Sequence, residues 1–491
     1  MPDLSEDLPQ HSYNGREATE CGDKCAEERN EFSAVAEFIS PFAFSNIRKW
    51  IMTVILASMT TVVTFGSSVW SSTIHRVAAQ FSVSETVTIL GVSLYVLGFA
   101  FGPIVWGPLS EISGRQLPLF LGFCIWLLLQ IPIGFVNNLP ALLTFRMLGG
   151  CFGAAPVALV SAMYADFWEP AERGTATAVY SAAVYIGPTL GPIFGSLVTE
   201  SHLGWHWIAW ITTIFGAIVG ILAFIMIPET YAPILQHRAN KKAGLYNASS
   251  GHRQLSAPNA DFRTFVRKYM IKPAIMICVE PVLIVMTLYI SIVYGILYLT
   301  FFAFPYSFED GRGWNPRIGS LPFLSILASV LISSIGVGLY SRKYYRPRLL
   351  ARGSVLPEDR LPPMILGSFI LPAGIFWFAW TSSAQISPVP QIISGLLIGS
   401  GIMLIFTNGV AFLVDIYLQS AASAMAANTC IRSAVAAGFP LAAPRMYKTL
   451  GISWATSVLG FLCVILIPAP ILFYKYGRKL REMSRFAPTS T

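Results

Sequence analysis

Charged residues are scarce in this chain of 491 residues. Asp, Glu, Lys and Arg make up 12% of the sequence, whereas 54% of it is hydrophobic. Soluble domains contain about 25% charged residues. Many apolar runs approach or exceed the roughly 20 residues that are needed to cross a bilayer. The composition excludes an ordinary soluble protein and predicts an all-α, polytopic membrane protein.

Several motifs that define other classes of protein are also missing. The chain has no Gly-x-x-x-x-Gly-Lys-Ser/Thr phosphate loop, so we expect an ion gradient, and not a nucleotide, as the energy source. Its seven cysteines show neither metal-ligand spacing nor a disulfide framework. We therefore expect a protein that is not an enzyme, without a metal or a cofactor. The polar N-terminal stretch lacks the layout of a signal peptide.

Twelve apolar runs predict twelve spanning helices, divided six and six by a polar stretch. This division gives a tail (1–47), a first half (48–227), a central loop (228–273), a second half (274–474) and a basic tail (475–491). Two pseudo-symmetric halves of six helices are typical of transporters. The expected spans are 50–72, 88–109, 117–136, 139–164, 174–199, 206–227, 274–304, 318–340, 362–382, 388–413, 420–446 and 450–474.

The basic residues indicate the orientation in the membrane. The net charge is +8, but most Lys and Arg residues fall in loops on one predicted side, which is the cytosolic side by the positive-inside rule. We therefore expect both termini in the cytosol and no nucleic-acid partner. The glycosylation sequon at Asn247 lies in the predicted cytosolic loop, so no glycan is expected there.

A short turn between the second and third spans contains an acid and a base. The stretch "GPLSEISGRQLPL" has Gly107 and Gly114, which allow close helix approach and a tight reversal. Glu111 and Arg115 lie four residues apart in it. An isolated turn of this kind would contain an ordinary surface ion pair of little energetic value.

This stretch resembles the signature turn of the major facilitator superfamily. The segment "LLTFRMLGGCFGAAP", with Arg146, resembles a second motif of that family. The segment "GPTLGPIFG" resembles the glycine-proline motif of its antiporter-type members. Further segments, such as "ADFWEPAERG", "PETYAP" and "NTCIRSAVAAGFP", are similar to the fungal drug:H+ antiporters with twelve spans. That subfamily includes multidrug, polyamine-type and secondary-metabolite exporters. The residues of the glycine-proline motif are Gly187, Gly191, Pro192 and Gly195.

The resemblance implies a proton-coupled exporter of small organic compounds such as drugs, toxins or fungal secondary metabolites. A polyamine or other cation exporter, an uptake symporter and a signalling transceptor remain alternatives. We expect a monomer in the plasma membrane or the vacuolar membrane, with the bilayer and a small-molecule substrate as partners.

The resemblance also implies roles for individual residues. Glu111, Arg115 and Asp166 would form a gate latch. Arg146, inside the membrane, would take part in proton handling, unless it is a structural arginine bonded to carbonyls of neighbouring helices. The glycine-proline motif would bend its helix and seal the inward leak path, unless it is a plain packing kink.

Two further sets of residues are candidates on physical grounds. Glu280, in the seventh span, could carry the coupling proton, because burial raises the pKa of a carboxyl, or it could be an acid at the cytosolic interface. Arg432 and Asp415 are weaker candidates that could reach the interface. Aromatic residues of the seventh span could line a substrate cavity. These are Tyr289, Tyr294, Tyr298 and Phe302.

Overall fold

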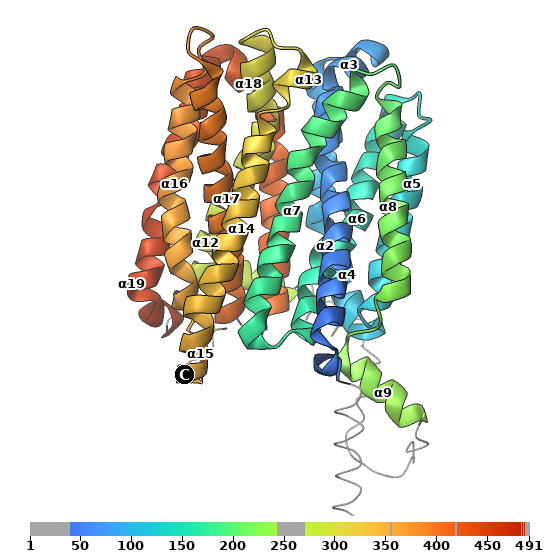
Figure 1. The fold of residues 1–491 in the computed structure, drawn as a ribbon, viewed down its shortest axis with the longest axis vertical. Helices are drawn as coiled ribbons and strands as arrows, with labels where there is room; N and C mark the ends of the chain where they lie inside the picture. Colours follow the sequence, from blue (N-terminus) through green and yellow to red (C-terminus); the bar gives the residue numbers. More distant parts are fainter. Residues whose placement is uncertain are drawn as a thin grey trace, which may run out of the picture.

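The protein is a bundle of long helices that run roughly alongside one another, as the computed structural model in Figure 1 shows. The described part contains no strand, in agreement with the all-α expectation. The predicted sequon at Asn247, the tail 1–39 and the middle of the central loop lie outside the described residues. The structure describes residues 40–242, 271–353, 356–417, 420–482, 484 and 486.

The first half contains six spanning helices, each formed by one of the predicted apolar runs. The first span ends in a 3-10 turn, η2 (Val69–Thr73), and continues into the short helix α3 (Ile74–Phe81). The segment after the first predicted span is thus partly helical. The six helices are α2 (Asn46–Ser68), α4 (Glu85–Ser113), α5 (Gln116–Ile133), α6 (Leu139–Phe167), α7 (Pro170–Thr199) and α8 (His206–Met226).

The second half repeats this arrangement with helices that are joined by short elements. Its long helices are α12 (Pro281–Pro305), α14 (Phe323–Tyr340), α16 (Leu361–Trp380), α17 (Pro388–Ile416), α18 (Ala421–Leu466) and α19 (Pro468–Glu482). Its shorter elements are α11 (Lys272–Val279), η4 (Tyr306–Asp310), α13 (Pro316–Gly319), η5 (Ser341–Tyr345), α15 (Arg346–Arg352) and η6 (Pro357–Arg360). Helix α9 (Ala232–Lys242) lies in the central loop.

The number of spans depends on one glycine. Within the described ranges, 11 helical segments are long and apolar enough to cross a membrane, and the last of them has 57 residues. A straight helix as long as α18, with 46 residues, would measure about 69 Å at 1.5 Å per residue. Gly451 interrupts it with φ 73° and ψ 166°, a conformation that residues with a side chain rarely adopt. The segment therefore supplies two spans, which gives the expected twelve.

The helices differ in how much of their surface the rest of the protein covers. In α12, 83% of the most apolar window is buried, whereas the figure for α8 is 33%. The uncovered face of α8 presents large apolar side chains such as Ile218, Ile221 and Phe224. Helix α12 is therefore central, and α8 has an apolar outer face that suits contact with lipid.

The two halves meet along α4 with α18 and along α7 with α14, and Figure 1 shows α7 beside α14. At the centre, the hydroxyls of Ser67 and Tyr298 lie 2.9 Å apart across this boundary. At the end that carries α3 and α13, Ser196 donates to Ser320 at 2.7 Å. We call the other end, with α9, α15 and α19, the basic end. The halves are thus in contact at the centre and at the end opposite the basic end.

Candidate functional site

The signature turn is shorter than its sequence suggests. Helix α4 continues to Ser113, so Gly107 and Glu111 lie in its last turns, and the chain reverses only at Gly114, where φ is +92°. A Cβ atom on Gly107 would have no atom within 4 Å, so the expected close approach there is wrong. A Cβ atom on Gly114 would overlap the carboxylate of Glu229. Of the two glycines, only Gly114 must lack a side chain, because its backbone conformation and the neighbouring carboxylate both exclude one.

The carboxylate of Glu229 caps helix α5. It accepts hydrogen bonds from four backbone N–H groups: those of Arg115 at 2.9 Å, Gln116 at 3.2 Å, Thr230 at 2.9 Å and Tyr231 at 2.9 Å. Arg115 and Gln116 are the N-cap and first residue of α5, where a negative charge also interacts favourably with the helix dipole. In the sequence, Glu229 lies in the segment "PETYAP", and no local pattern there predicts a capping role.

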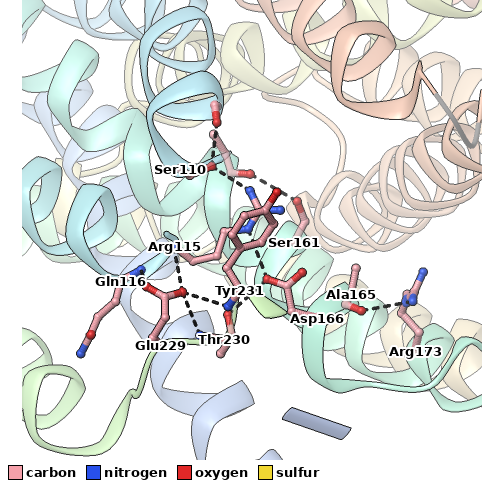
Figure 2. A network of polar contacts seen from close by, with 12 residues as sticks. Ser110, Arg115, Gln116, Ser161, Ala165, Asp166, Arg173, Glu229, Thr230 and Tyr231 are labelled. Carbon is pink, nitrogen blue, oxygen red and sulfur yellow. Dashed lines mark hydrogen bonds and ion pairs between the residues drawn. The ribbon is translucent and has the colours of Figure 1, made fainter. Parts of the chain in front are cut away.

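Arg115 and Asp166 form an ion pair inside the first half (Figure 2). The Nε atom of Arg115 lies 3.2 Å from Oδ2 of Asp166, and their side chains are 14% and 17% exposed. Nη1 of Arg115 donates to Ser110 at 2.7 Å, and the hydroxyl of Thr230 donates to the same Asp166 oxygen at 3.2 Å. The guanidinium also faces the ring of Tyr231, with its carbon 4.8 Å from the ring centroid. The pair joins the start of α5 to the end of α6.

The second half contains a pair in the matching position. Nε of Arg360 lies 3.0 Å from Oδ2 of Asp415, and the hydroxyl of Tyr345 donates to that oxygen at 3.3 Å. Arg360 directly precedes α16, and Asp415 is the second-last residue of α17. Arg115 and Asp166 occupy the same places relative to α5 and α6. By sequence alone Asp415 is a weaker candidate, and Arg360 is not a candidate.

The start of α7 brings the two halves together at the basic end. Arg173 donates to the carbonyl of Ala165 at 3.3 Å and is attracted by the carboxylates of both pairs. A Cβ atom on Gly174 would overlap the hydroxyl of Ser341, which belongs to the second half. Nearby, Glu172 lies 3.8 Å from Arg346 of α15. The halves are therefore in direct contact at the basic end too.

Arg146 is hydrogen-bonded to carbonyl groups on two neighbouring helices. It is 2% exposed and donates to Gly91 at 2.9 Å, Gly66 at 2.7 Å and Ser67 at 3.1 Å. These carbonyls belong to α4 and α2, and the guanidinium carbon also lies 4.4 Å from the ring centroid of Tyr95. This is the arrangement of a structural arginine, the alternative that the sequence left open. A role in proton handling stays a prediction.

Glu280 does not lie inside a continuous seventh span. The helix breaks at Glu280, between α11 and α12, because a residue before a proline disfavours helical dihedrals. The carboxylate is fully buried and accepts from Tyr417 at 3.0 Å, from the backbone N–H of Phe486 at 3.2 Å and from Ser484. The structure thus places it at the basic end, and its role in coupling stays a prediction.

The glycines of the glycine-proline motif form one face of α7 that packs on α2 and η2. A Cβ atom on Gly191 would lie 2.7 Å from the backbone nitrogen of Val69, and one on Gly195 would lie 2.7 Å from its oxygen. A Cβ atom on Gly187 would overlap a hydroxyl of α2. Pro192 lies inside α7, where its missing N–H interrupts the helical hydrogen bonds. The motif allows backbone contact between two helices. A sealing function stays a prediction.

The four aromatic candidates of α12 are packed inside the protein. Tyr289, Tyr294, Tyr298 and Phe302 are between 0% and 5% exposed. Tyr294 and Tyr298 pack edge to face, with ring centroids 5.2 Å apart. A small pocket near Arg146 is lined by residues of the first half and by none of these four. In this structure they form a closed centre and do not line an open cavity.

Comparisons with known proteins agree with this architecture. The family model described as Major Facilitator Superfamily matches residues 56–440. The citrinin biosynthesis cluster MFS transporter of Monascus ruber is 47% identical over 450 residues, which cover 91% of this chain and 90% of that protein. The ascochitine biosynthesis cluster MFS transporter of Didymella fabae is 42% identical over 443 residues, 90% of this chain and 86% of that protein. The solved xylose transporter XylE from E. coli has a TM-score of 0.62 at 15% identity, covering 87% of this chain and 99% of that one.

Proposed function

Because this chain belongs to the Major Facilitator Superfamily, we propose that it exports small organic compounds, with secondary metabolites as the substrate class, in exchange for protons. The observation that carries the proposal is the similarity, along 91% of the chain, to a transporter named for a biosynthetic cluster. A cell that makes such a compound needs an exporter, and a secondary transporter with two halves can supply one.

The contacts between the halves support export by alternating access. At the basic end, α7 meets the second half through Gly174 and Ser341, and Glu172 lies near Arg346. Opening this end requires these contacts to separate. The Arg115–Asp166 pair lies within one half, so it would shape the gate surface and would not itself be broken by a rigid rotation of the halves.

We propose that the proton gradient drives the cycle without a cofactor. Among the described residues, the buried acids are Glu229 and Glu280. The carboxylate of Glu229 already accepts hydrogen bonds from the backbone N–H groups at the start of α5. Glu280 is therefore the better candidate for the coupling proton, because protonation of a buried carboxylate can change the hydrogen bonds that Tyr417, Ser484 and Phe486 make with it.

We further propose a monomer in the plasma membrane, with the basic end and both termini in the cytosol. The collection of Lys and Arg on α15 and α19 at one end supports this orientation. The sequon at Asn247 tests it. Endoglycosidase treatment of the protein from a secretory-competent host should leave its mobility unchanged. A mobility shift would show that Asn247 carries a glycan, and it would contradict the proposed orientation.

Efflux from cells provides the test of the function. A yeast strain without its own drug pumps would express the chain and be loaded with citrinin, the compound in the name of the Monascus ruber relative. We expect faster citrinin efflux than in cells with an empty vector, and loss of this difference when a protonophore collapses the gradient. Net citrinin accumulation would instead identify an uptake symporter.

A further inference from the structure

Among the described residues, two arginines are buried within the spanning helices, and the hydrogen bonds that their N–H groups donate differ. Arg146 donates to three carbonyls. Arg432, on α18, is 5% exposed, and its Nε atom has no hydrogen-bond acceptor among the described residues. Arg432 lies eleven residues after Ala421, where α18 begins, which is roughly 16 Å along the helix. It is therefore a buried cation deep inside the bundle.

Aromatic rings of α12 and α17 lie against this cation, and a third ring, from α7, packs on one of them. The guanidinium carbon of Arg432 lies 4.8 Å from the ring centroid of Tyr294 and 4.7 Å from that of Phe406. The ring of Phe406 stacks on Tyr294 at 6.0 Å and meets Tyr185 edge to face at 5.2 Å. We call these four residues the Arg432 cage. Tyr185 belongs to α7 of the first half, and the other three belong to the second half.

Polar atoms in the Arg432 cage and beside it lack hydrogen-bond partners among the described residues. They are the buried hydroxyl of Tyr185 and, outside the cage and one helical turn before Arg432, Oδ1 of Asn428. Buried polar groups in proteins are normally hydrogen-bonded, and an uncompensated charge within a membrane is costly. The unpaired atoms of the cage therefore indicate a ligand that supplies their partners.

The charge around the cage determines what that ligand can be. The buried acids of the described chain are Glu229 and Glu280, which lie at the basic end. Cation–π contacts with Tyr294 and Phe406 stabilise the guanidinium and leave its charge in place. A cationic ligand would be repelled by Arg432, whereas an anionic one would be attracted strongly in a site of low dielectric constant.

We propose that the Arg432 cage is the substrate site and that it takes organic anions with a planar conjugated ring. A carboxylate or phenolate of the substrate accepts a hydrogen bond from Nε of Arg432, and the hydroxyl of Tyr185 donates a second one. The flat ring system packs against Tyr294 and Phe406 once these two rings, which stack on each other in this structure, move apart. The inference rests on the proposed export function and narrows its substrates to anions, which excludes the polyamine alternative.

The shared cage also connects substrate binding to the transport cycle. Tyr185 contacts Phe406 across the boundary between the halves, so rotation of one half against the other separates the cage into two parts. A bound anion that bonds both to Arg432 and to Tyr185 favours the state in which the halves are together. Substrate binding and closure of the centre are therefore coupled.

Binding of two matched dyes to the purified full-length protein in nanodiscs tests the proposal. Fluorescein and pyronin Y share a planar xanthene ring but carry opposite charges. We expect the wild-type protein to bind fluorescein at least roughly tenfold more tightly than pyronin Y. The variant Arg432→Gln should bind fluorescein roughly 10- to 100-fold more weakly, the effect of removing one buried charge-assisted hydrogen bond.

Three variants make this result interpretable. Arg445→Gln changes an exposed arginine on the same helix and should leave both affinities unchanged. Arg432→Lys keeps the charge and should keep the preference for fluorescein. Tyr185→Phe removes the unpaired hydroxyl and retains the ring against Phe406, so fluorescein binding should fall several-fold even if Arg432→Gln does not fold.

The proposal is overturned if the wild-type protein binds neither dye or binds pyronin Y as tightly as fluorescein. Unchanged fluorescein affinity in a folded Arg432→Gln variant, or in Tyr185→Phe, overturns it as well. Equilibrium binding needs no gradient. Failure of the anion site is therefore distinguishable from failure of the export function, which would appear as absent protonophore-sensitive efflux with dye binding intact.

Discussion

Nε of Arg360 lies 3.0 Å from Oδ2 of Asp415, at the place in the second half where Arg115 meets Asp166 in the first. In each half the arginine directly precedes a spanning helix, and the aspartate is the second-last residue of the next long helix. Each pair is mostly shielded from solvent. Each pair joins two helices of its own half at the basic end. Arg173, at the start of α7, is attracted by the aspartates of both pairs.

Neutralising either aspartate should disturb the gate at the basic end. With Asp166→Asn or Asp415→Asn, the partner guanidinium loses its ion pair in a partly buried setting, at a cost of roughly 1–3 kcal/mol for a charged hydrogen bond. We expect at least a roughly fivefold loss of efflux and a wider separation of the basic ends of the two halves, measured between spin labels on the two halves.

Asp359 offers a matched control for these variants. The Asp359 side chain is 17% exposed, but its partners Arg348 and Arg352 are 48% and 46% exposed, so water can solvate either guanidinium when the pair is lost and the pairs contribute little. Asp359→Asn should therefore leave efflux and label distances close to wild type. An equal effect of Asp359→Asn and Asp415→Asn would contradict a specific role for the Arg360–Asp415 pair.

Removing the carboxylate of Glu229 should destabilise the first half. Glu229→Ala leaves four backbone N–H groups without their acceptor, and each unsatisfied buried donor costs about 1–3 kcal/mol unless water replaces the acceptor. Thermal unfolding in detergent should show a clearly lowered midpoint. Glu169→Ala is the control, because Glu169 is an exposed helix N-cap without a side-chain hydrogen bond. Equal midpoints for the two variants would refute the capping role.

Adding one methyl group to the glycine face of α7 should interfere with helix packing. A Cβ atom on Gly191 would lie 2.7 Å from a backbone nitrogen of η2, so Gly191→Ala must push α7 away from α2. We expect reduced thermal stability and efflux. In Gly336→Ala the new methyl group meets open space on α14, and the change should be neutral or stabilising by up to about 1 kcal/mol. Wild-type behaviour of Gly191→Ala would contradict close backbone contact.

The role of Arg146 can be separated into structure and coupling. Arg146→Lys cannot supply the three divergent donors that reach Gly66, Ser67 and Gly91. If Arg146 is structural, this variant unfolds at a lower temperature while the remaining transport keeps its dependence on the pH gradient. Normal stability with transport that no longer depends on the gradient would instead support proton handling, and Arg146→Ala should then abolish transport without loss of surface expression.

The sequence predicted the spans well because each one is a contiguous apolar run, and the break at Gly451 lies one residue after the predicted start of the last span at 450. The family resemblance also predicted that Arg115 meets Asp166, which the ion pair confirms. The latch role of these residues, and the part of Glu111 in it, stay predictions. The sequence did not reveal that Glu229 caps α5, because 114 residues separate it from Arg115 and no local pattern connects them.

Other positions depended on three-dimensional detail that a motif does not contain. Gly107 fills a motif position, yet its surroundings are open, so its missing side chain serves no close contact in this conformation. Glu280 was placed within a span because the chain around it is apolar. The backbone turns before Pro281 and leaves Glu280 at a helix end. The unpaired donor of Arg432 can be recognised only after every neighbouring acceptor is located.

Proton movement driven by substrate tests the central claim most directly. Purified protein would be placed in liposomes that contain a pH-sensitive dye, and citrinin would be added on the side that faces the basic end. Proton-coupled export predicts a pH change inside the liposomes that depends on citrinin and is abolished in Glu280→Gln. Citrinin flux without any proton movement in the wild-type protein would contradict the account.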